Sequence, residues 1–177
     1  MYPQEIMFYI FETLIKPILT YGSDVWGLSK EGLSKIDKVF VGFARHVLGV
    51  RHNASNIIVF GESGQLPPSV ACQISTLCFF NRLYHMPNNT IVKQVFNELL
   101  NLHEQGFPTW ITKACELADT FKLDVYENKN IFKSKCKRAV SNNFISRRES
   151  NMSNESQFPI LRKYCLLKSK FIIEPYL

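Results

Sequence analysis

The chain has 177 residues, of which 46% are hydrophobic and 14 are Phe, a composition that favours one packed domain and excludes a disordered chain. The formal net charge of +6 is concentrated in one segment. Residues 122–148 carry eight Lys or Arg and two Asp or Glu, whereas the rest of the chain carries thirteen of each sign. Such a block indicates an anionic partner, with nucleic acid as the first candidate and an acidic membrane surface as the second.

The cysteines and the N-terminal residues predict an intracellular protein. The five cysteines are an odd number without a C-x-x-C pair, and the apolar opening is interrupted by Glu5 and Glu12 and lacks the basic lead of a signal peptide. No uninterrupted apolar run approaches the roughly 20 residues that a membrane span requires. We therefore expect reduced thiols, a nuclear or cytoplasmic location and no membrane partner.

Residues 4–20 are predicted to form a helix with apolar side chains on almost every side. Pro17 lies near the end of this segment, where proline kinks or terminates the last turn. A helix of this composition needs cover on all sides. Either elements outside this chain supply that cover, or the helix forms the centre of a small bundle.

Residues 29–49 contain the strongest helical pattern. Ser29 can accept the amide hydrogens of the first turn, and Glu31 suits the positive end of the helix dipole. Gly49 follows the last periodic residue, where a left-handed C-cap is common. Apolar residues recur at spacings of three and four and predict one buried face. These residues are Leu33, Ile36, Val39, Phe40, Phe43, Val47 and Leu48.

The following segments also favour helices. The β-branched run at residues 57–60 fits either a brief extended segment or part of a helix, because so short a run does not discriminate between them. Further helices are predicted from Pro67-Pro68 to the turn at Pro87, over residues 91–102, and from Thr109 onward. The predicted fold is all-α, an irregular array of about six to seven helices with at most one short extended segment near residues 57–60.

A basic amphipathic helix is predicted over residues 128–145, because a partial apolar stripe lies beneath its charges. Most Lys-rich helices are simply solvated, but the concentration of charge here and the interleaved aromatic residues favour contact with nucleic acid. Phosphates are the expected target, so binding would be sensitive to salt and nearly blind to sequence. The candidate contacts are Lys129, Lys133, Lys135, Lys137, Arg138, Arg147 and Arg148.

The last part of the chain is predicted to contain a boundary. Nine of the seventeen residues in 141–157 are Ser or Asn, a composition typical of loops. This composition predicts a helical domain over residues 1–140, a linker or loop over 141–158, and a short, truncated terminal helix over 159–177.

Catalytic and metal-binding motifs are scarce. Polymerases use paired carboxylates to hold two metal ions, yet the chain contains no adjacent aspartates. Gly61-Glu62-Ser63-Gly64 departs from the G-x-S-x-G nucleophile elbow, because Gln65 stands where the second glycine belongs. A Gly-rich turn is therefore the favoured interpretation. The histidines and cysteines lack the spacing of a zinc site, and we predict no catalytic residue, no metal ligand and no cofactor.

Three motifs follow one another in the first half of the chain: Tyr21-Gly22-Ser23-Asp24-Val25-Trp26-Gly27, Phe43-Ala44-Arg45-His46-Val47-Leu48-Gly49-Val50 and Gly61-Glu62-Ser63-Gly64-Gln65-Leu66-Pro67. In residues, order and rough spacing they resemble the region downstream of the polymerase palm and thumb in non-LTR (LINE-type, jockey-like) retrotransposon reverse transcriptases. The resemblance spans residues 11–83 and returns weakly over 161–177. Ser63 departs from the family, which more often has leucine there.

The resemblance implies a non-catalytic fragment of an RNA-directed DNA polymerase. The catalytic palm would lie upstream, and Mg²⁺ is implied only for that absent domain. We expect the basic helix to contact template RNA or target DNA, and the apolar helix at residues 4–20 to pack on the upstream polymerase domain or another protein. The alternative is a helical protein-interaction module or an inactive retroelement relic. An independent small-molecule enzyme has no supporting set of residues.

Overall fold

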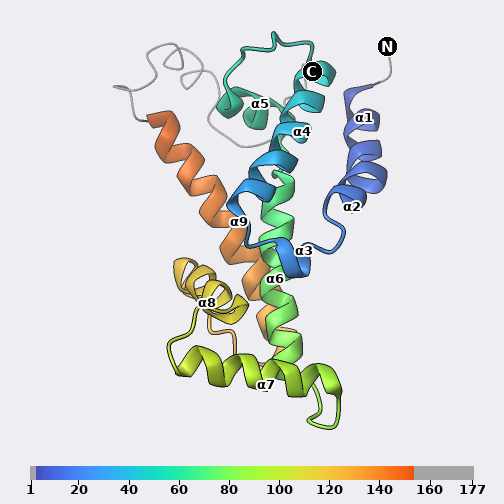
Figure 1. Cartoon of the computed structure of the whole chain (residues 1–177). Coiled ribbons are helices and arrows are strands. Elements are labelled where there is room, and N and C mark those ends of the chain that lie inside the picture. Colours follow the sequence, from blue (N-terminus) through green and yellow to red (C-terminus); the bar gives the residue numbers. More distant parts are fainter. Residues whose placement is uncertain (1–2, 154–177) are drawn as a thin grey trace.

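The computed structural model describes residues 3–153, and every regular element in that range is a helix (Figure 1). Of these described residues 75% are helical, which confirms the all-α prediction. The helices number eight within that range when the first three segments are counted as one rod, slightly more than the sequence predicts.

The first rod joins α1 (Gln4–Ile10), a π-helical turn η1 (Phe11–Ile15) and α2 (Lys16–Leu19). Pro17 has no amide hydrogen to donate to the carbonyl four residues earlier, and the helix widens into the π turn just before it. The predicted helix is therefore present, with an irregularity where the proline indicates one.

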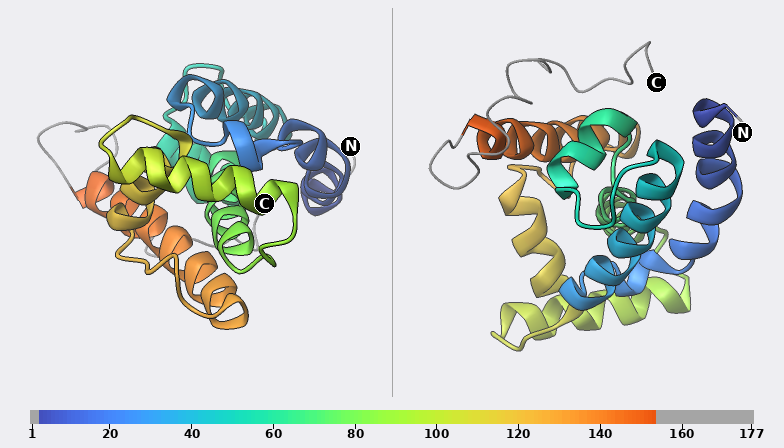
Figure 2. Two further views of the ribbon diagram at one scale, coloured as in Figure 1. Left: turned by 60° about the horizontal axis from the view of Figure 1, so that its bottom comes forward. Right: turned by 90° about the horizontal axis from the view of Figure 1, so that it is seen from above.

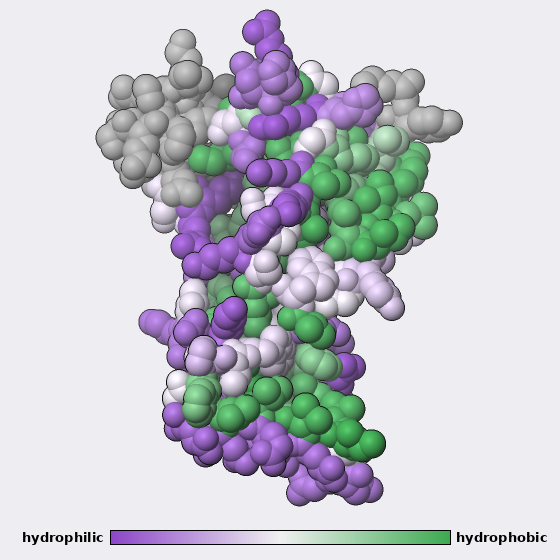
Figure 3. All heavy atoms as spheres, viewed as in Figure 1, coloured by the Kyte–Doolittle hydropathy of each residue, from purple (hydrophilic) through white to green (hydrophobic). Residues whose placement is uncertain are grey.

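This rod covers the long helix α4 (Lys30–Leu48) with one face only. Phe8 and Phe11 are buried, and the Phe11 ring lies 4.7 Å from that of Phe43 between centroids. The opposite face is exposed, and Figure 3 shows apolar residues gathered over the rod. The interpretation of the rod as the centre of a bundle is therefore wrong. The exposed apolar residues are Ile6, Tyr9, Ile10, Leu14 and Ile18.

The aromatic turn after the rod packs tightly on α6 (Pro68–Tyr84) through the short helix α3 (Ser23–Trp26). Thr76 Oγ1 of α6 donates a hydrogen bond of 3.0 Å to the Ser23 carbonyl. Gly27 follows α3, and a Cβ there would lie 2.5 Å from Thr76 Oγ1 and would also collide with the Ser23 carbonyl. This motif therefore serves close packing between backbone and helix.

The ends of α4 match the sequence prediction. Ser29 Oγ accepts a hydrogen bond from the Gly32 amide at 3.2 Å, and Gly49 adopts the left-handed conformation with φ of +65°. The buried face differs in part, because Val39 is 49% exposed while Val41 and Ala44 are buried. The buried face of α4 is therefore rotated slightly about the helix axis relative to the predicted face.

Residues 57–60 lie in the helix α5 (Asn56–Ser63), so the extended alternative is wrong. Ser55 accepts a hydrogen bond from the Ile57 amide and begins the helix. Val59 is fully buried, and the Phe60 ring stacks on Phe40 of α4 at 5.6 Å. Packing against α4 therefore decides between the helix and the extended segment, which the sequence of this short run left open.

α6 is the central element, since it contacts α3 and α4 as well as the last three helices of the described chain (Figures 1 and 2). The rod, α4 and α5 share one hydrophobic cluster, and α6 forms a second cluster with the last three helices. In both figures the rod and the last helix lie on opposite sides of α4. The last three helices are α7 (Ile91–Glu104), α8 (Trp110–Thr120) and α9 (Lys129–Ser153).

The loop predicted to begin at residue 141 is wrong as far as residue 153, because α9 continues through it. Val140 is buried, the Phe144 ring lies 5.5 Å from Phe60 of α5, and Arg148 Nε donates to the Ile57 carbonyl at 3.3 Å. These three residues recur every four positions, so one face of the helix is held despite the Ser and Asn around it. The rest of the predicted linker and the terminal helix lie outside the described residues.

Candidate nucleic-acid interface

The start of α9 is fixed against α6 by one buried amide. Asn81 of α6 is 1% exposed, and its Nδ2 donates to the carbonyls of Val125 and Glu127 at 2.8 Å each. These carbonyls lie in the loop just before α9, so the amide holds that loop on α6. Phe132 is buried one turn into α9 and completes the attachment.

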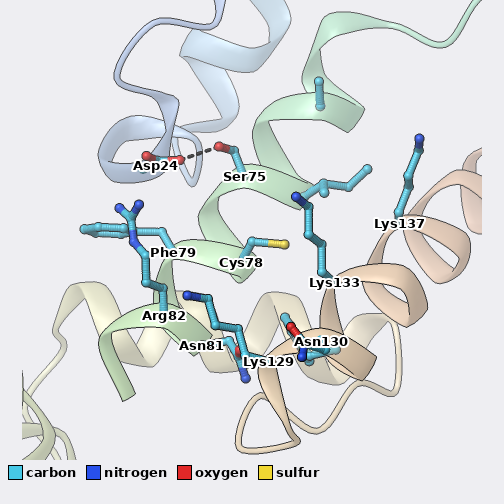
Figure 4. Close-up of a pocket in the computed structure, with 13 residues that line it drawn as sticks. Asp24, Ser75, Cys78, Phe79, Asn81, Arg82, Lys129, Asn130, Lys133 and Lys137 are labelled. Carbon is cyan, nitrogen blue, oxygen red and sulfur yellow. Dashed lines mark hydrogen bonds between the residues drawn. The ribbon is translucent and has the colours of Figure 1, made fainter. Parts of the chain in front are cut away.

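A groove of about 780 Å³ opens between α6 and the first half of α9, with α3 at its edge (Figure 4). Lys129, Lys133 and Lys137 of α9 line one side and Arg82 of α6 lines the other. The lysines are four residues apart, and this spacing places them on one face of the helix. The groove thus has basic side chains on both walls.

The groove contains one acidic side chain. Asp24 of α3 accepts a hydrogen bond from Ser75 Oγ of α6, which occupies part of its carboxylate. None of the four basic residues forms an ion pair with any residue in the described range. The N-terminal end of α9 also lies here, where Asn128 Oδ1 accepts a hydrogen bond from the Asn130 amide and the helix dipole adds partial positive charge. The electrostatic environment therefore favours an anion.

Two of the predicted contacts lie on α9 but outside the groove. Lys135 Nζ forms an ion pair of 3.0 Å with Glu127, so its charge is balanced. Arg138 is exposed and does not line the groove. The predicted basic face is therefore divided between the groove and the outer surface of the helix.

The last two predicted contacts lie near the far end of α9. Arg147 is exposed beside a separate hollow between α5 and α9. Arg148 is 6% exposed and bonds to the Ile57 carbonyl, so its prediction as a surface contact is wrong. Its guanidinium instead joins the far end of α9 to α5, where the hydrogen-bond partner and burial favour a structural role.

Arg82 is the groove residue that sequence reasoning missed. It is an isolated arginine on α6, and its guanidinium carbon lies 4.9 Å from the Phe79 ring centroid. No local pattern marks it, because only the packing of α6 on α9 brings it opposite the lysines. The spacing of Lys129, Lys133 and Lys137 was by contrast visible in the sequence.

Possible metal ligands and the turn compared with a nucleophile elbow can both be located in the part of the chain that the structure describes. No group of three or more His, Cys, Asp or Glu side chains there could hold a metal ion. Ser63 ends α5, is fully buried, and donates to the Phe60 carbonyl, while Gly64 adopts the left-handed conformation. This is a helix terminus, where the hydroxyl has none of the exposure of a nucleophile elbow.

Among residues 3–153 no helix combines the length and apolar character needed to cross a membrane. No protein-family model, no curated protein and no solved structure matches the chain.

Proposed function

We propose that this chain is a non-catalytic accessory region of a retroelement reverse transcriptase that holds template RNA or target DNA by its phosphates. Two independent features support this proposal. The three motifs in residues 21–67 resemble the region beyond the palm and thumb of that family. The groove between α6 and α9 supplies a basic surface of the kind that nucleic-acid backbones require.

The observation that carries the proposal is the row of Lys129, Lys133 and Lys137 facing Arg82. Ammonium groups are point charges that suit phosphate without reading the base. The guanidinium of Arg82 lies over the ring of Phe79, and this contact holds its positive charge at the groove wall. Binding of this kind fixes the position of the strand and carries little sequence preference.

The test is a salt titration of binding by the full chain to labelled single-stranded RNA and to duplex DNA. Four basic groups on four phosphates predict a slope of log K against log salt of about −3 to −4. The groove variant K129Q/K133Q/K137Q is expected to lower the magnitude of this slope by about 2 to 3.

A matched control exists on the same helix. K135Q/R138Q/R147Q removes three positive charges from α9 but touches no residue of the groove. We expect its slope to change by less than about 1, because these residues lie outside the bound strand's path. Equal losses in both variants would mean non-specific attraction to a basic helix, and no binding at low salt would overturn the proposal.

A second candidate function is a helical protein-interaction module, favoured by the exposed apolar face of the rod at residues 4–19. Its occupant would be the polymerase domain that the resemblance places before this segment. Under this alternative the charge variants change no measured affinity, whereas L14Q/I18Q weakens association with a separately expressed polymerase domain. An inactive relic would show neither effect.

A further inference from the structure

Two cysteines face each other where α6 packs on α9. Cys78 of α6 and Cys136 of α9 are both free thiols, and Cys78 packs against the hydrophobic cluster in which Cys136 is buried, so that the two thiols interact. Cys136 is fully buried. Because α6 and α9 pack closely along this stretch, the two thiols are neighbours that a disulfide could join across the helices.

Cys78 is also open to the groove. Its side chain lines the groove, and Figure 4 shows its sulfur pointing from α6 toward Lys133. Small reagents can reach this thiol through the groove without unfolding of the chain. The other described cysteines differ, since Cys72 is fully buried and Cys115 lies on α8 and does not line the groove.

The charges around Cys78 favour its thiolate. The hydrogen bond from Cys136 lowers the pKa of Cys78 to about 7, with Lys133 helping, while burial and Asp24 oppose the shift. Arg82 and Lys129 line the same groove. Burial raises the pKa of Cys72 and of Cys115, and donation to Cys78 together with burial raises that of Cys136.

We propose that Cys78 is a site of oxidative modification, at which a peroxide attacks the groove-facing thiol and Cys136 then closes a disulfide between α6 and α9. The site goes beyond the proposed function and does not depend on it. Its ligand class is a hydroperoxide or another small two-electron oxidant that fits the groove. The resulting bond would fix the two walls of the groove to each other.

The chemistry balances in two steps. The Cys78 thiolate attacks one oxygen of hydrogen peroxide, the O–O bond breaks, and a sulfenic acid and hydroxide form. The sulfur of Cys136 then attacks the sulfenic sulfur as its proton is lost, the S–O bond breaks, and water leaves. The two thiols lose two electrons in total, and peroxide accepts both.

The experiment treats the folded full chain with limited hydrogen peroxide and maps its cysteines by mass spectrometry after digestion without reduction. We expect one dominant product, the Cys78–Cys136 cross-linked peptide. The variant C136S keeps a hydroxyl donor but lacks the resolving sulfur, so a sulfenic acid trapped by dimedone is expected on Cys78. C115S is the matched control and should leave the cross-link unchanged.

A second readout needs no substitution. At neutral pH iodoacetamide is expected to alkylate Cys78 about tenfold faster than Cys115, because its thiolate fraction is larger. Earlier oxidation of any other cysteine, or equal alkylation rates, would overturn the site. A stable sulfenic acid on Cys78 of the unsubstituted chain would overturn the role of Cys136. Circular dichroism of C136S confirms that the variant is folded before its product is scored.

Discussion

The motif-bearing segment at residues 21–67 and the groove between α6 and α9 use their residues in opposite ways. In the first region the side chains cap helices and fill the core, as Ser29 and Phe40 do. In the groove Lys129, Lys133 and Lys137 are exposed and unpaired within the described range. The comparison teaches that the segment at residues 21–67 maintains the fold, while the surface suited to a ligand lies elsewhere.

This contrast leads to opposite expectations for substitutions. Changes at the buried and capping residues of this segment should lower stability and alter binding only through unfolding. Changes to the groove lysines should alter binding and leave stability almost unchanged, because exposed charges without partners contribute little to folding.

The largest expected loss of stability is at Phe40. This side chain is fully buried between the rings of Phe11 and Phe60, at 5.2 and 5.6 Å. Phe40→Ala should lower the free energy of unfolding by about 4 kcal/mol, since it leaves a large cavity. Urea denaturation followed by circular dichroism measures the loss. Val39→Ala, at the neighbouring exposed position, should cost less than about 1 kcal/mol.

A substitution at Asn81 tests whether this groove-lining residue also fixes the loop before α9 on α6. Asn81→Ala leaves the buried carbonyl of Val125 and the partly buried carbonyl of Glu127 without their donor and should cost about 3 kcal/mol. Hydrogen exchange should also accelerate at the first turn of α9. Asn101→Ala on the exposed face of α7 is the control, and equal costs for the two would contradict the role of Asn81.

The same substitution at Gly27 and at Gly42 should change the free energy of unfolding in opposite directions. Gly27→Ala forces a methyl group into Thr76 Oγ1 and the Ser23 carbonyl and should cost about 2 kcal/mol. Gly42→Ala meets no atom within 4 Å inside α4 and should stabilise by about 1 kcal/mol. Thermal denaturation distinguishes the two. A neutral Gly27→Ala would show that the turn does not pack as described.

The smallest expected effect is at the first turn of α4. Ser29→Ala removes the acceptor for the Gly32 amide and should lower stability by about 1 kcal/mol. Ser34→Ala lies on the exposed face of the same helix and should change stability by less than about 0.5 kcal/mol. If the two variants lose equal stability in urea, the cap contributes nothing.

The fold was predictable where local chemistry decides it. Ser29 and Gly49 mark the ends of α4 through hydrogen bonds and backbone conformation that involve neighbouring residues only. The continuation of α9 past residue 141 was not predictable, because contacts of Phe144 and Arg148 with α5 hold it there. Composition alone favoured a loop, and tertiary packing outweighed it.

The candidate site was predictable in part. The sequence located the basic helix, but it could not divide the helix into a groove face and an outer face. That division depends on where α6 lies, and so does the contribution of Arg82. Arg148 was included among the contacts because it belongs to the basic block at residues 122–148, whereas packing on α5 buries it.

The central claim is that the groove lysines serve binding and do not hold the fold. The most direct test compares K129Q/K133Q/K137Q, K135Q/R138Q/R147Q and the unsubstituted chain in RNA binding across a salt series, with urea denaturation of the same samples. We predict that all three unfold at nearly the same urea concentration and that only the groove variant loses salt-dependent affinity. Equal RNA affinity in all three folded proteins would contradict the claim.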